Sequence, residues 1–120
     1  MTQLAARQVG AITIVDVPKS FMDMGRTSPQ RGHLRELVTE LLANGRDKIV
    51  LNLSQAVYCS HTALGELCWT FKTIRDKGGQ LRLSNVPPNV RAALELVHLV
   101  TIFDIRDDEA SAIQSFESAM

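Results

Sequence analysis

The chain has 120 residues, 45% of them apolar, and its 13 basic and 13 acidic side chains give a formal net charge of zero. This length is typical of one domain, which we place at 1–120. Because the charges cancel, no bulk field attracts nucleic acid or an anionic membrane, and we expect direct binding to neither. The sequence contains neither a run of roughly 20 apolar residues for a membrane span nor the apolar centre of a signal peptide, so we expect a cytoplasmic protein.

In the first half of the chain, strand and helix patterns follow one another. A short strand near 4–9 and a second strand at 11–17 flank Gly10, which predicts a hairpin. The Ser-Pro pair at 28–29 predicts a helix start, because a capping hydroxyl precedes a proline whose missing N–H costs nothing at the first position. One apolar face then continues to the Asn-Gly pair at 44–45, where we expect the helix to end.

The second half repeats this alternation three times. Glycines and prolines mark the ends of the predicted elements. These are, in order, a strand at 49–53, a helix from Thr62 or its neighbours to the glycines at 78–79, a strand at 80–84, a helix from 87–88, a strand at 102–105 and a helix at 109–116. The predicted order of elements is therefore ββαβαβαβα.

Two of the predicted strands, 49–53 and 80–84, alternate apolar with polar residues. Such strands bury one face, whereas the central strands of a doubly wound nucleotide-binding fold are apolar on both faces. We therefore predict an α/β fold with a mixed, open-faced sheet of about five strands and about four helices, mainly on one face.

The sequence offers little for catalysis. Cys59 and His61 lie two apart, so a thiol enzyme with a Cys/His nucleophile is a remote alternative. Burial in the core explains Cys59 and Cys68 better, and we expect both thiols to be reduced. A metal site formed by these three residues would need a fourth ligand that the spacing does not supply. We expect no catalytic residue, no metal and no cofactor.

The segment 49–65 joins an alternating strand to an amphipathic helix through the turn Ser-His-Thr-Ala-Leu-Gly at 60–65. It resembles the signature of STAS domains, and the segments at 77–83 and 90–91 extend the resemblance over nearly the whole chain. In the anti-sigma-factor antagonists of that family the turn reads Asp-Ser-Ser/Thr-Gly-Leu-Gly, and its second hydroxyl residue is phosphorylated. The resemblance implies a STAS fold and a protein that binds a serine-kinase-type anti-sigma factor and thereby releases a sigma factor.

On this resemblance Thr62 stands at the phosphoacceptor position, while Ser60, His61 and Ala63 replace the family's aspartate, first serine and glycine. The family implies that the kinase partner brings ATP and that a serine/threonine phosphatase restores the binding form. An acidic residue after the family's second strand lies near the acceptor, and Asp23 is the candidate here. The alternative within the same fold is a phosphorylation-independent scaffold or regulatory protein of a signalling assembly, and self-association is compatible with either.

Thr62 has two interpretations. Its hydroxyl would cap the helix, contributing about 1 kcal/mol, or it would accept a phosphate of roughly −1.5 to −2 charges, which the free N–H groups at the helix start tolerate. His61 is likewise either an exposed turn residue or a proton-sensitive contact.

Trp69 points away from the apolar face of its helix, toward the side of Thr62 and Gly65. Tryptophan is enriched at binding hot spots, so this side is a candidate partner surface, although Trp69 could instead cover a neighbouring loop. Exposed apolar residues of 21–24 would enlarge it. The partner-binding candidates are Ser60, His61, Gly65, Trp69 and Asp23.

Overall fold

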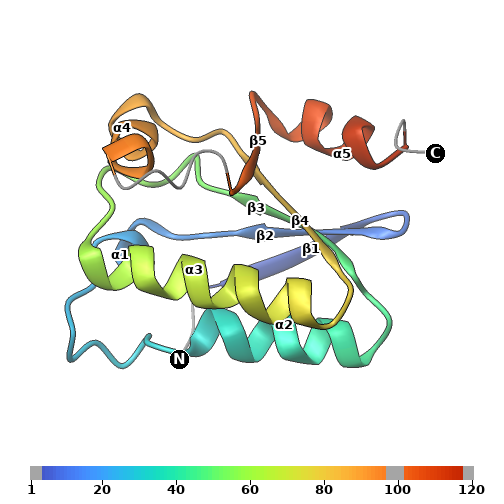
Figure 1. Cartoon of the computed structure of the whole chain (residues 1–120), viewed down its shortest axis with the longest axis horizontal. Helices are drawn as coiled ribbons and strands as arrows, with labels where there is room; N and C mark the ends of the chain where they lie inside the picture. Colours follow the sequence, from blue (N-terminus) through green and yellow to red (C-terminus); the bar gives the residue numbers. More distant parts are fainter. Residues whose placement is uncertain (1–3, 97–101, 118–120) are drawn as a thin grey trace.

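A five-stranded mixed sheet carries helices on both faces (Figure 1). This computed structural model describes residues 4–96 and 102–117. The strands are β1 (Ala5–Val9), β2 (Ile12–Asp16), β3 (Lys48–Asn52), β4 (Gln80–Ser84) and β5 (Asp104–Arg106). The helices are α1 (Lys19–Met22), α2 (His33–Ala43), α3 (His61–Asp76), α4 (Pro88–Leu96) and α5 (Glu109–Glu117).

The strands lie across the sheet in chain order, β1-β2-β3-β4-β5. β1 pairs antiparallel with β2 through the predicted hairpin, where Gly10 has a φ of 60° that favours glycine. The remaining neighbours are parallel, and α2, α3 and α4 connect them. This α/β architecture confirms the predicted fold class, and the predicted order of elements holds with the short α1 added.

The main core lies between the sheet and the layer formed by α2 and α3, which run side by side in the same direction (Figure 1). β3 and β4 point alternate apolar residues into it, as the sequence indicates. Phe21, Met22 and Met24 also belong to this core, with exposures of 0%, 0% and 4%. The expectation that they enlarge an exposed surface is therefore wrong, because α1 turns this apolar segment inward.

The second face of the sheet is covered by α5 rather than left open. Ile12, Ile14 and Val50 meet Ala112 and Phe116 there in a small separate apolar cluster. β2 is consequently buried on both faces along four of its five residues. The helices still lie mainly on the first face, because only α5 packs on the second.

Charged residues fasten α5 to the sheet at both of its ends. At the start of α5, the Arg7 guanidinium lies 2.7 Å from Asp16 and 2.6 Å from Glu109. Toward its end, Arg82 of β4 lies 4.2 Å from the centroid of the Phe116 ring and donates a 3.0 Å hydrogen bond to Ser115. Polar contacts thus supplement the small apolar cluster under α5.

Two predicted boundaries are wrong. α2 begins at His33 rather than at 28–29, because the Ser28 hydroxyl accepts a hydrogen bond from the Gln30 N–H and the chain turns there. The chain enters α2 through Gly32, whose φ is 86°. β5 begins at Asp104 rather than at residue 102.

The contact between Arg7 and Glu109 predicts a pH-dependent stability. Hydrogen bonds from Arg7 hold the pKa of Glu109 below its ordinary value of 4.5, so the pair stabilises the folded chain above pH 4.5 and loses this effect as the pH falls through the lowered value. We expect Glu109→Gln to lower the free energy of unfolding at pH 7 by about 0.5–1 kcal/mol, discounted for solvent screening. The deficit should vanish in acid, as urea unfolding across the pH range would show. Glu40→Gln on α2, an exposed carboxylate with no ion pair among the described residues, is the control, and a deficit independent of pH would contradict the assignment.

Candidate functional site at the start of α3

Ser60 organises the turn that begins α3. Its side-chain oxygen accepts a 3.0 Å hydrogen bond from the Ala63 N–H, so Ser60 is the N-cap residue. The same hydroxyl donates to the carbonyl of Met24 at 2.7 Å, and the Ser60 N–H donates to the carbonyl of Met22 at 2.9 Å. The interpretation of Thr62 as the helix cap is therefore wrong, because Ser60 performs that task.

Thr62 is the second residue of α3 and is half-buried. Among the residues that the structure describes, none forms a hydrogen bond with its hydroxyl. The side chain stands beside the first N–H groups of the helix, where the helix dipole favours an anion. His61, immediately before it, is exposed. The turn thus presents an unengaged hydroxyl at a position that can accommodate added negative charge.

Asp23 lies next to this turn, because Ser60 donates hydrogen bonds to the carbonyls of Met22 and Met24, the two residues that flank Asp23. Its carboxylate, however, lies 2.9 Å from the ammonium of Lys19, one turn back along the chain. The structure therefore brings the Asp23 backbone to the site while its charge is paired elsewhere.

The exposed face of α3 continues from Thr62 past Gly65 to Trp69. The indole is 59% exposed, which confirms the expectation that it faces solvent. The guanidinium of Arg35, from α2, lies 4.5 Å from the centroid of the indole ring. A shallow groove of about 540 Å³ runs along this face. It is lined by Gly65, Cys68, Trp69, Lys72, Thr73 and Asp76.

Glu66 is the residue of this site that the sequence analysis missed. Its carboxylate accepts a 2.7 Å hydrogen bond from the Gly32 N–H at the start of α2 and lies 3.9 Å from Arg31. The only signal in the sequence is an acidic residue four positions after Thr62. The partner of Glu66 is the N–H of Gly32, and a helix beginning at 28–29 would place that N–H inside α2, where it would bond within the helix.

With this geometry in place, comparison with known proteins gives the family. The model of the STAS domain matches residues 5–112. The chain belongs to the STAS domain family. The resemblance that the turn at 60–65 suggested is thereby confirmed.

Two relatives of this STAS chain are similar in sequence. An anti-sigma F factor antagonist of Paenibacillus polymyxa is 31% identical over 71 residues, which are 59% of this chain and 61% of that protein. An anti-sigma-B factor antagonist of Bacillus subtilis is 30% identical over 81 residues, 68% of this chain and 73% of the relative. The match thus spans about three fifths of the first relative's length.

Solved structures agree on the fold. The solution structure of the protein TM1081 of Thermotoga maritima has a TM-score of 0.82 at 23% identity and covers 98% of this chain and 91% of that one. An anti-sigma factor antagonist from Mycobacterium paratuberculosis has a TM-score of 0.75 at 15% identity, covering 97% and 94%. At these identities the likeness concerns the STAS fold alone.

The cysteines of this STAS domain do not meet the requirements of a thiol enzyme. Cys59 is 7% exposed, and burial, together with the nearby Cys68, raises the pKa of its thiol to about 11. Burial also raises the pKa of Cys68. A catalytic thiolate requires the opposite shift and an accessible sulfur. Within 4–96 and 102–117, no three His, Cys, Asp or Glu side chains are grouped so that they could hold a metal ion.

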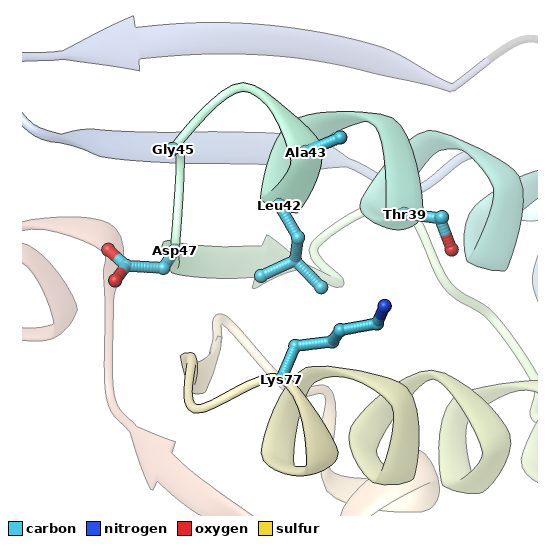
Figure 2. A pocket seen from close by; sticks show the side chains of 6 residues that line it. All are labelled: Thr39, Leu42, Ala43, Gly45, Asp47 and Lys77. Atoms are coloured by element: carbon cyan, nitrogen blue, oxygen red, sulfur yellow. The ribbon is translucent and has the colours of Figure 1, made fainter.

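A second hollow, of about 260 Å³, lies at the far end of the helix layer (Figure 2). Leu42 and Lys77 reach into it from the ends of α2 and α3, while Asp47 points away from Lys77. Lys77 is the C-cap residue of α3, where its positive charge complements the negative end of the helix dipole. None of the described helices is long and apolar enough to cross a membrane.

The capping arrangement predicts different effects for the two hydroxyl residues of the turn. We expect Ser60→Ala to lower the free energy of unfolding by about 1–2 kcal/mol, because the cap and the bond to Met24 are both lost. Thr62→Ala removes no hydrogen bond, and we expect a change within about 0.5 kcal/mol. Urea unfolding of both variants measures the difference. Equal losses would contradict the assignment of the cap to Ser60.

The buried Cys59 should react slowly with iodoacetamide at pH 7.5, because its raised pKa leaves little thiolate and its sulfur is covered. We expect labelling to be at least about tenfold slower than in the urea-unfolded chain, since burial adds to the thiolate deficit. Peptide mass spectrometry after timed labelling would measure the rate. The Cys68→Ser variant isolates Cys59, and labelling as fast as in the unfolded chain would refute the buried assignment.

Proposed function

We propose that this STAS protein is an anti-sigma factor antagonist that binds a serine-kinase-type anti-sigma factor and thereby releases a sigma factor. The names of both similar relatives support the proposal. The observation that carries it is the start of α3, where the Thr62 hydroxyl makes no hydrogen bond within the described chain and lies on the same face of the helix as the exposed Trp69. Its action would take place in the cytoplasm and consist of binding, with no cofactor of its own.

The exposed face of α3 supports a role in partner binding. Trp69 supplies a large apolar surface, and the guanidinium of Arg35 stacked on it adds a cation held in place. Tryptophan and arginine are the residue types most enriched at binding hot spots. Gly65 leaves the groove open, because a Cβ placed there would meet nothing within 4 Å. We therefore assign recognition to this face, with His61 and the neighbouring Asp23 at its edge.

Phosphorylation at Thr62 would switch the binding off. The kinase partner would transfer the γ-phosphoryl group of ATP to the threonine oxygen, releasing ADP and the hydroxyl proton. The N-terminus of α3 stabilises the added charge of roughly −1.5 to −2, so the fold accepts it. A docked partner would have to desolvate that charge. A serine/threonine phosphatase would restore the hydroxyl by hydrolysis, with release of inorganic phosphate.

One observation favours a second candidate function, a phosphorylation-independent STAS scaffold in a signalling assembly. The nearby acidic group is engaged, since Asp23 is paired with Lys19, and Ser60 stands where the family has an aspartate. In that case the same face of α3 would bind its partner constitutively.

A pull-down from native-host lysate with three baits tests the proposal. We expect the native chain to retain a serine-kinase anti-sigma factor and Thr62→Asp to retain at least about tenfold less, because unfavourable charge at an interface costs several kcal/mol. Ala43→Asp is the control: it adds the same charge at the exposed last residue of α2, beside the far hollow and away from Arg35, and should bind as the native chain does.

Mass spectrometry of the retained proteins decides between the functions. Equal capture of the kinase by the native chain and Thr62→Asp would refute the switch and favour constitutive binding. Failure of the native chain to capture any such kinase would refute the anti-sigma factor antagonist itself.

A further inference from the structure

The starts of α2 and α3 are joined by one charge-assisted hydrogen bond between residues 34 apart in the sequence. The Glu66 carboxylate accepts it from the Gly32 N–H at 2.7 Å, and the Glu66 side chain is only 16% exposed. Arg31 lies 3.9 Å from the same carboxylate and is 52% exposed. A bond to a charged group in a partly buried setting is stronger than an ordinary amide bond.

This bond supplies one half of a capping box for α2. Gly32 is the N-cap residue of α2 and has no side chain with which to cap the helix. In a capping box, an acidic residue three positions into the helix accepts the N–H of the N-cap residue. Arg35 occupies that position in α2, so Glu66 accepts this N–H from the neighbouring helix instead.

Thr62 precedes Glu66 by four residues, so the two side chains lie on the same face of α3, roughly 5–6 Å apart at their Cβ atoms. Helical side chains lean toward the N-terminus of their own helix. The Glu66 carboxylate therefore leans over the turn that carries Thr62 while it holds the start of α2.

We propose that Glu66 is a positioning residue that transmits the phosphorylation of Thr62 to α2. A phosphate at position 62 repels the Glu66 carboxylate, releases the Gly32 N–H and draws the Arg31 guanidinium to itself. This inference rests on the proposed modification of Thr62 and states how that modification would change the start of α2.

Electrostatics gives the direction of the change. Like charges four residues apart in a helix repel each other, and a phosphate carries more charge than a carboxylate. Arginine pairs with phosphate through two parallel hydrogen bonds. The half-exposed Arg31 would exchange its 2.9 Å hydrogen bond to the Arg26 carbonyl for this pairing. The first turn of α2 also carries Arg35, which packs on Trp69. A loosened first turn of α2 would therefore shift Arg35 and change the partner surface.

Solution NMR of the full chain tests this without any partner. Phosphothreonine is incorporated at position 62 or, as a matched control, at position 39, and both chains are compared with the unmodified protein. With phosphate at 62 we expect the Gly32 amide proton to shift upfield and its exchange with solvent to accelerate by about tenfold, because a charge-assisted bond is lost. The Arg31 Nε–H signal should shift downfield. Phosphate at 39 should change neither.

The Glu66→Gln variant separates transmission from mere proximity. Glutamine keeps the size and the accepting oxygen but not the charge, so phosphate at 62 should then disturb Gly32 no more than phosphate at 39 does. An unchanged Gly32 amide in the native background, or an equal change in Glu66→Gln, would overturn the proposal. The native-background comparison decides even if Glu66→Gln does not fold.

The two proposals can fail separately. Loss of partner capture by Thr62→Asp together with an unmoved Gly32 amide would leave the proposed function standing and refute the role of Glu66. A moved Gly32 amide in a chain that captures no anti-sigma factor would support the role of Glu66 and refute the proposed function.

Discussion

The hydroxyl of Ser60 is the contact on which the site depends. It accepts a hydrogen bond from the Ala63 N–H in the first turn of α3 and donates one to the Met24 carbonyl. One oxygen therefore fixes both where the helix begins and where the preceding loop lies. Cys59 is consequently buried, and Thr62 becomes the second residue of the helix. Because Ser60 caps the helix, no hydrogen bond within the described part of the chain depends on the Thr62 hydroxyl.

Alternation of apolar and polar residues along the strands predicts the fold class, but it does not predict that both faces of the sheet are covered. Ile49 and Leu51 point into the main core as the pattern of β3 predicts. The opposite face carries few apolar residues, yet α5 covers it, because Arg7 and Arg82 contribute contacts to the helix that a hydrophobicity pattern does not register. Polar anchoring of this kind depends on residues distant in sequence, so periodicity alone does not reveal it.

At the site, too, local periodicity predicts some features, whereas contacts between residues distant in sequence determine others. The strand ending before the turn, the helix after it and the exposure of Trp69 all follow from local periodicity. Capping is one of the two interpretations that the sequence allows for Thr62, and the hydrogen bonds show that Ser60 is the cap. Glu66 was missed because its partner, Gly32, belongs to another helix. Local patterns thus gave the elements, and long-range hydrogen bonds decided the roles of individual residues.

The parallel arrangement of α2 and α3 gives the position of Thr62 its significance. Glu66 joins the two helices near their N-termini. Leu42 and Lys77 line the hollow at their C-terminal ends (Figure 2). Free N–H groups of both helices therefore gather at the end where Thr62 lies, and the fold tolerates an anion there. Glu66 already carries negative charge at this end, and it secures the start of α2 by accepting a hydrogen bond from the Gly32 N–H. A second anion would compete with it for the same donors and for Arg31. Under the proposed modification of Thr62, we therefore expect α3 to stay folded and the start of α2 to be the part of the surface that responds.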